Sequence, residues 1–333
     1  MAIDFGAIGA AATGTTSLAV AHPTGITTGQ LLLLGVVSKY PAAPPTTPSG
    51  WTLLTSVAGG AGASGADSGD VLVSVYAKVA DGTESGTVTV TITGGNTAIG
   101  RMLRATGEGT GFSVAAASGA DTSSGTGYSA TCTTNPGITQ DDRMFCFTGG
   151  NSDVTWSGTA LTATGVTFDA GAERGDSLTS GGDDCGLLVS EFGLTVGTAS
   201  AAPVLTSTAS GAVAGATVVV RLRETGLRFA GAGLGNSGST SLTPSIPSSP
   251  SGPLAGDLLV MAVENKYPPN LPTTPSGWTL QRQASAGNGL DIVDAGTVSM
   301  AVYTRISDVT ETGTVSVTVT GGNSARARIW RFR

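Results

Sequence analysis

Side chains suited to covalent chemistry are few in this chain of 333 residues. It has a single histidine, His22, which could act as a general base. No serine or cysteine nucleophile motif, metalloprotease motif or phosphate-binding glycine loop accompanies it. Acidic residues are scattered along the chain, and no pair stands out for glycoside cleavage. We therefore predict that the protein is not an enzyme, with no catalytic residue and no cofactor.

The three cysteines are Cys132, Cys146 and Cys185, all in the middle third of the chain. An odd number without a repeated spacing argues against a disulfide framework. The pattern favours buried free thiols, because a free cysteine behaves as a small apolar residue. A bridge between Cys132 and Cys146 is the alternative that the sequence leaves open.

Three glycine-rich loops carry closely spaced carboxylates, a residue type that can bind calcium. They are GADSGD (Gly65–Asp70), GGDDCG (Gly181–Gly186) and GLDIVD (Gly289–Asp294). None has the spacing of an EF-hand or of a calcium-binding nonapeptide repeat. We interpret them as solvated turns and predict no metal site.

A proline-rich stretch followed by a tryptophan occurs twice, at Lys39–Leu54 and Lys266–Gln281, with twelve of sixteen positions identical. The prolines exclude a central strand and favour an extended loop. The tryptophan is predicted to pack into the core, since it contributes a large apolar area. In the alternative, the two loops form an exposed ledge for a glycan or a protein. The candidate interaction residues are Tyr40, Pro44, Pro45, Trp51, Tyr267, Pro269, Pro272 and Trp278.

Four arginines cluster at the end of the chain, in the segment Ala325–Arg333. In a strand, Arg326 and Arg328 share a face with Trp330 and Phe332, while Arg331 and Arg333 point the other way. One interpretation is an edge strand whose charges block unwanted pairing. The other is a cluster that docks onto an acidic partner through arginine–carboxylate pairs.

The elements that position these residues recur at a fixed offset of 227 residues. Tyr76 corresponds to Tyr303, Asp81 to Asp308, and the motif GGN recurs at the same distance. A weaker copy lies between, without the proline-rich loop. We therefore predict three domains, at residues 1–107, 108–225 and 226–333, the middle one diverged.

The periodicity inside each repeat is that of strands. TVTVTIT (Thr87–Thr93) and TVSVTVT (Thr314–Thr320) alternate strictly, as half-buried antiparallel strands do. LLLLGVV (Leu31–Val37) is a continuous apolar run that suits a central strand. Turns are rich in Gly, Asp, Asn and Ser. The expected fold is all-β, with three tandem antiparallel β-sandwich domains of jelly-roll or immunoglobulin-like type.

The net charge and the hydropathy of the chain argue against two classes of partner, nucleic acids and membranes. The net charge of −7 repels phosphate groups, so we expect no nucleic-acid binding. No apolar stretch reaches the roughly 18 residues of a membrane span, so we expect no membrane partner. The first residues, MAIDFGAIGAAATG, do not resemble a signal peptide, which predicts synthesis in a cytoplasm.

Four motifs of the third repeat, matched in the first, carry a family resemblance. They lie at Gly256–Val260, Pro275–Leu280, Val302–Arg305 and Asp308–Thr318. These motifs resemble β-sandwich modules in virion structural proteins of tailed bacteriophages, which serve in capsid decoration, head fibres or tails. The resemblance implies a non-enzymatic protein on the virion surface that binds capsid or tail proteins, or another copy of itself. The alternative is an adhesin that binds a host-surface glycan through the loops of the first and third repeats.

Overall fold

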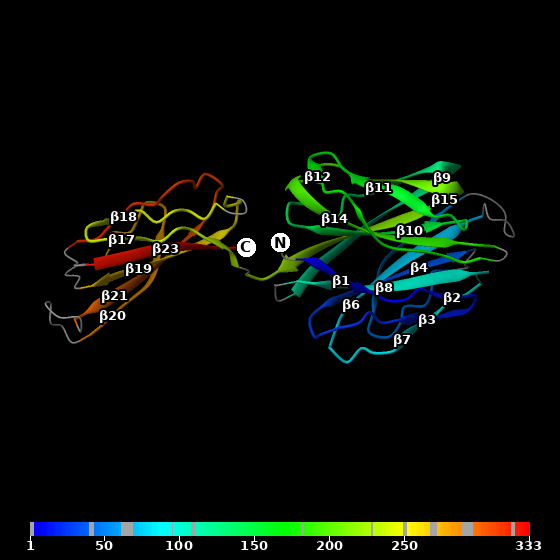
Figure 1. Ribbon diagram of the computed structural model, residues 1–333, viewed down its shortest axis with the longest axis horizontal. Coiled ribbons are helices and arrows are strands. Elements are labelled where there is room, and N and C mark those ends of the chain that lie inside the picture. Colours follow the sequence, from blue (N-terminus) through cyan, green and yellow to red (C-terminus); the bar gives the residue numbers. More distant parts are fainter. Residues whose placement is uncertain are drawn as a thin grey trace. The chain divides into compact units, whose positions relative to one another are not determined.

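A computed structural model of the chain describes residues 3–39, 43–60, 69–94, 96–107, 111–180, 183–227, 229–248, 252–266, 272–287, 296–320 and 324–333. In these ranges the chain forms strands and no helix (Figure 1). The strand pairs are antiparallel, which confirms the predicted all-β class. Accordingly, no helix in the described ranges is long and apolar enough to cross a membrane.

The chain divides into two compact units, Met1–Thr225 and Gly226–Arg333. The first unit holds the first two predicted repeats and the second unit holds the third. The predicted boundary at residue 107 lies inside the first unit and stays a prediction.

The first repeat is built on a sheet with the neighbour order β1-β8-β4-β6-β5. A separate two-stranded sheet, β3-β7, belongs to the same repeat, and β2 pairs with β8. The strands are β1 (Asp4–Ile8), β2 (Ala12–Gly14), β3 (Ser17–Ala21), β4 (Leu31–Lys39), β5 (Thr52–Gly59), β6 (Val71–Val79), β7 (Thr87–Thr91) and β8 (Ala98–Thr106).

The second repeat uses the same neighbour order in its sheet. Here β9 pairs with β15, β15 with β10, β10 with β14, and β14 with β13. Its strands β9 and β15 are long, and the segment Val204–Thr208 of β15 pairs with β9 on one side and β11 on the other. The strands are β9 (Gly111–Cys132), β10 (Arg143–Gly150), β11 (Trp156–Thr162), β12 (Val166–Phe168), β13 (Ala172–Leu178), β14 (Gly186–Gly197) and β15 (Val204–Thr225).

The third repeat restores the topology of the first, with the order β16-β23-β19-β21-β20. The strands are β16 (Phe229–Ala232), β17 (Asn236–Gly238), β18 (Ser241–Leu242), β19 (Leu258–Lys266), β20 (Thr279–Ala286), β21 (Val298–Ile306), β22 (Val317–Thr318) and β23 (Ser324–Phe332). The alternating run Thr314–Thr320 forms only the short strand β22. Its partner β18 stops before Pro244, which lacks the N–H that a longer ladder needs.

Each sheet of the first and third repeats has an inner face, which packs on the small two-stranded sheet of its own repeat. In the first repeat Leu32, Leu34 and Tyr76 of the sheet meet Leu18 and Val20 of β3 in one cluster. In the third repeat Met261, Tyr303 and Ile329 meet Leu242 and Val317. This inner core follows from strand alternation, because every second side chain of a strand faces the same side.

The proline-rich loop is fixed in the same way in both repeats. The hydroxyl of Tyr76 donates a hydrogen bond to the carbonyl oxygen of Pro45 at 2.7 Å. Tyr303 repeats this bond to Pro272 at 2.9 Å. Burial raises the pKa of Tyr76 to about 12, so the hydroxyl keeps its proton and remains a donor. The loop is therefore tied to the sheet by a side-chain bond at each copy.

An ion pair holds the turn after β6 in the first repeat, and the same pair recurs after β21 in the third. The Nζ of Lys78 lies 2.8 Å from Oε1 of Glu84, and Nη2 of Arg305 lies 2.6 Å from Oε1 of Glu311. Burial acts to raise the pKa of Glu84, but hydrogen bonds from Lys78 and from backbone N–H groups outweigh it and bring the pKa to about 2. The motif D-x-T-E of the sequence is thus a structural turn.

The opposite, outer face of the first repeat's sheet packs on the sheet of the second repeat. Leu33, Val37 and Val73 of the first repeat share one cluster with Phe147 and Val218 of the second. A side chain at Gly35 would overlap the ring of Phe147, and one at Gly149 would overlap Val37 and Val73. The two sheets of this unit therefore approach closely, with glycines at the points of contact.

We expect Tyr76→Phe to lower the free energy of unfolding by about 1 kcal/mol, since one buried hydrogen bond is lost and the carbonyl of Pro45 is left unpaired. Urea unfolding of the first unit, followed by circular dichroism, measures the change. Val79→Ala, at a side chain that is 58% exposed on the same strand, is the control and should change little. Equal unfolding midpoints for Tyr76→Phe and the parent chain would contradict this role of the tyrosine.

Candidate functional site

The candidate site is the outer face of the third repeat's sheet. We define it by strand register as the side chains of β19, β21 and β23 that point away from β18 and β22. Its members are Leu258, Val260, Ala262, Glu264, Lys266, Val298, Met300, Val302, Thr304, Ile306, Ser324, Arg326, Arg328, Trp330 and Phe332. Arg282 of the edge strand β20 extends this face, because it lies opposite Val302.

The aligned face of the first repeat is covered by the second repeat. Leu33, Val37, Val73 and Ile99 are fully buried there, with 0% exposure. The outer face of the third repeat is open: Met300 is 49% exposed and Ile306 62%. The same surface of the same fold is therefore core in one repeat and solvent-facing in the other.

Two substitutions between the repeats place charge on the open face. Glu264 stands where the first repeat has Val37, and Arg326 stands where it has Ile99. The two residues are direct cross-strand partners in the ladder between β19 and β23. Opposite charges at such positions stabilise a sheet modestly. They also make the open face compatible with water, as a wholly apolar face would not be.

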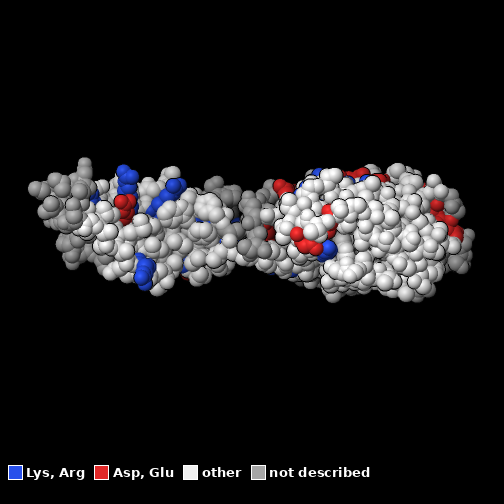
Figure 2. Space-filling model, turned by 90° about the horizontal axis from the view of Figure 1, so that it is seen from below, with Lys and Arg blue, Asp and Glu red and all other residues white. Residues whose placement is uncertain are grey.

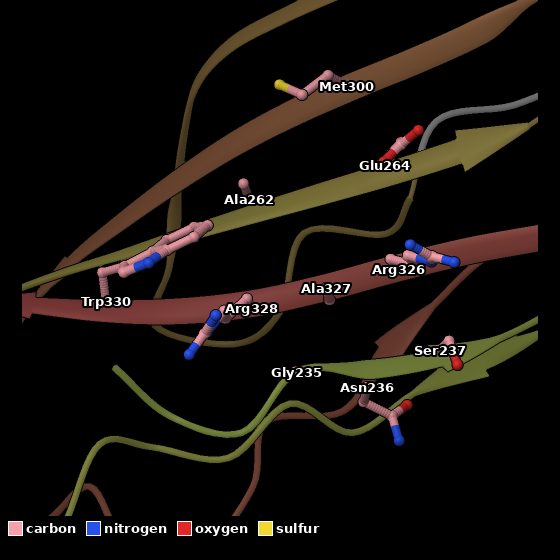
Figure 3. A pocket seen from close by; sticks show the side chains of 10 residues that line it. All are labelled: Gly235, Asn236, Ser237, Ala262, Glu264, Met300, Arg326, Ala327, Arg328 and Trp330. Atoms are coloured by element: carbon pink, nitrogen blue, oxygen red, sulfur yellow. The ribbon is translucent and has the colours of Figure 1, made fainter. Parts of the chain in front are cut away.

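A hollow of about 420 Å³ lies on this face (Figure 3). Met300, Ala262 and Trp330 contribute apolar side chains from three neighbouring strands, and Glu264 and Arg326 contribute charge. The Nε of Arg328 donates a hydrogen bond to the carbonyl oxygen of Gly233 at 3.1 Å, which orients its guanidinium beside the hollow. The hollow therefore combines apolar side chains with charged ones, with Glu264 and Arg326 toward one end and Arg328 nearer Trp330.

The C-terminal arginines are divided between the two faces of β23. Arg326 and Arg328 are exposed on the outer face beside Trp330, as strand alternation predicts. Arg331 is fully buried and donates a hydrogen bond to the carbonyl oxygen of Ala230 at 3.0 Å. Arg333 pairs with Asp257 at 3.1 Å. Of the four arginines, two are thus presented for an intermolecular contact and two hold the unit together.

The tryptophans of the two proline-rich loops are buried rather than exposed for binding. Trp51 and Trp278 are only 8% and 7% exposed, so their rings pack into the inner cores. Pro45 and Pro272 are buried and accept the tyrosine hydrogen bonds, while Pro44 is exposed. Of the other candidate residues, Tyr40, Tyr267 and Pro269 lie outside the described residues. The described part of both loops thus offers no exposed aromatic ring.

Groups that could do chemistry are not gathered in the described ranges. No cluster of three or more histidine, cysteine or carboxylate side chains suited to a metal is found there. Cys132, Cys146 and Cys185 are free and buried, as their spacing predicts, and no bridge joins the first two. Burial raises the pKa of the Cys132 thiol to about 12, which keeps it in the unreactive protonated form. Most of the acidic loops Gly65–Asp70 and Gly289–Asp294 lies outside the described residues.

The charge of the two units differs in sign. Residues 1–225 contain eight Lys or Arg and 17 Asp or Glu, a net charge of −9, whereas residues 226–333 contain eight and six, a net charge of +2. Figure 2 shows basic atoms on the described surface of the second unit and mainly acidic atoms on that of the first. The basic excess of the second unit includes the arginines of the outer face.

Comparison with protein-family models, with curated proteins and with solved structures gives no match to this chain.

Sequence reasoning identified Arg326 and Arg328 but missed the apolar members of the face, such as Met300 and Val302. A signal was present in the alignment of the first and third repeats. Apolar Val37 and Ile99 are replaced by Glu264 and Arg326, whereas Val71 and Val75 stay valine at Val298 and Val302. Such paired replacements mark a surface that is buried in one copy and exposed in the other.

A buried lysine shows how the covered face of the first repeat is completed. The Nζ of Lys39 donates hydrogen bonds to the carbonyl oxygens of Asn151 at 2.7 Å and Asp184 at 2.8 Å, both in the second repeat. Lys39 is fully buried, and the aligned Lys266 of the open face is half-buried. The cation at this position therefore meets acceptors from the sheet that covers it.

We expect Lys39→Met to lower the free energy of unfolding of the first unit by about 2 kcal/mol or more, because two buried carbonyls lose a charged donor. Urea unfolding measures it. Lys266→Met, at the aligned position of the open face, is the matched control and should cost less because that side chain is half-buried. Equal losses in the two variants would show that the covering sheet does not depend on Lys39.

Proposed function

We propose that this protein is a non-enzymatic structural protein of a tailed-phage particle, built of three tandem β-sandwich domains at residues 1–107, 108–225 and 226–333. It binds at the outside of the capsid or tail by protein–protein contacts. The observation that carries the proposal is the open outer face of the third repeat. An apolar sheet face that is core in one repeat and exposed in another supports a role in contact with a partner.

The composition of the open face supports a protein partner. Its centre is apolar, with Met300, Val302 and Trp330, and arginines stand beside it. Aromatic residues, methionine and arginine are the types enriched at protein interfaces. A small-molecule site would need a more enclosed cavity with converging polar groups.

The motifs that resemble phage virion modules also support the proposal by their structural roles. Tyr303 ties the proline-rich loop, and Arg305 and Glu311 close the following turn. These are devices that stiffen a repeat, which suits a module placed on a particle surface. The glycan-binding alternative stays a prediction, and the buried Trp51 and Trp278 do not favour it.

The test is the protein content of virions from the phage or prophage that encodes the chain. Particles purified on a density gradient should contain its peptides at a fixed ratio to the major capsid protein, in every fraction across the particle peak. Separation of heads from tails then assigns the location. An abundant host protein serves as the control for contamination. Peptides that are absent from the peak, or that vary independently of the capsid protein, would reject the proposal.

A further inference from the structure

Of the three large sheets formed by the described residues, the sheet of the third repeat has an outer face that no other sheet covers. The outer face of the first repeat and the facing surface of the second cover one another in a common core. The outer face of the third repeat has no such cover among the described residues, where Met300 and Ile306 stand exposed. In the first unit two large sheets pack face to face, and a second copy of the chain would supply an equivalent cover through its own open face.

The contact residues of the third repeat differ from those that receive the second repeat. In the first repeat Gly35 leaves room for the ring of Phe147. The third repeat has Ala262 at this position, and its methyl group would overlap a ring placed in the same way. A hollow floored by Ala262 and flanked by Met300 and Trp330 is present instead. The face is therefore shaped for a partner other than a sheet of the second repeat's type.

The open face is large enough for a weak, reversible contact. Four strands of eight or nine residues cover about 30 by 19 Å, given the usual rise and spacing of strands. Two such faces together bury roughly 1,100 Å² or more, which exceeds the lower limit of about 1,000 Å² for a specific interface. Exposed Met300 and half-buried Trp330 supply anchors that a hollow on the opposite copy can receive.

The charges of the face are compatible with self-pairing. Each copy carries a carboxylate at Glu264 and exposed guanidiniums at Arg326 and Arg328. A two-fold axis presents the acceptor of one copy to the donors of the other, and the reverse, so that each copy supplies both members of every pair. Arg282 on the edge strand β20 lies at the rim, where it keeps its contact with water.

We propose that the outer face of the third repeat binds the same face of a second copy of the chain, forming an isologous dimer. The inference rests on the proposed function, because it names the partner of the outer face that carries that proposal.

Sedimentation equilibrium of the full chain, from low to high micromolar concentration, tests the proposal. The parent chain should reach the mass of a dimer. Val302→Asp, at the centre of the face, should weaken the dimer at least about tenfold, because the interface would bury an unpaired charge. Val309→Asp is the matched control, since Val309 is 55% exposed in a turn and outside the face. It should leave association unchanged, and circular dichroism verifies that both variants fold.

Two charge variants make the test specific for face-to-face pairing. Glu264→Arg and Arg326→Glu should each weaken self-association, because like charges then meet across the two-fold axis. An equimolar mixture of the two should form a heterodimer, since their faces are complementary. A parent chain that is monomeric throughout, or a mixture that fails to associate when the parent does, would overturn the proposal.

The salt dependence distinguishes this partner from an acidic one. Most of the contact is apolar and the pairs between Glu264 and the arginines lie at its charged part, so added salt should weaken the dimer only modestly. Complete dissociation of the dimer at higher salt would overturn the apolar face-to-face pairing. These measurements use purified chain, so their failure is independent of whether the protein is found in virions.

Discussion

The first unit depends on one constraint: the central strand β4 is buried on both faces of its sheet, so both faces must be covered. In β4 all nine residues from Leu31 to Lys39 are buried. The inner cover comes from within the repeat, through β3 and β7. The outer cover has to come from another sheet, and in the first unit the second repeat provides it. Burial at about 25 cal/mol per Å² of apolar surface makes this second cover a large part of the unit's stability.

The third repeat satisfies the same constraint only partly. Its inner core is retained, with Trp278 and Tyr303 in the same roles as Trp51 and Tyr76. On the outer face, Glu264 and Arg326 lower the cost of exposure, while apolar Val260, Val302 and Trp330 remain. Exposed apolar residues are ordinary when they are scattered singly, but these lie on neighbouring strands of one face. A face that is part charged and part apolar is instead typical of an interface that is open in one state and covered in another.

The sequence predicts much of the repeat and little of its packing. Alternation at Thr87–Thr93 and the apolar run Leu31–Val37 suffice to predict strands. The distribution of the arginine side chains of Arg326–Arg333 over the two faces of β23 follows from the two-residue period of a strand. The burial of Trp51 follows from its size. The covering of β4 by β10 could not be predicted, because an apolar run states that a face needs a cover without specifying which sheet supplies it. The burial of Lys39 was missed for the same reason, since its acceptors belong to distant loops.

The central claim is that one face of the fold is covered in the first repeat and open in the third until a second copy covers it. Hydroxyl-radical footprinting of the full chain over a range of concentrations measures this at single residues. The account predicts that Met300 and Trp330 are modified readily in dilute solution and become protected as the concentration rises. The aligned Val73 and Leu103, which are fully buried, should be protected throughout. Modification of Met300 and Trp330 that does not change with concentration, or ready modification of Val73 and Leu103, would contradict the account.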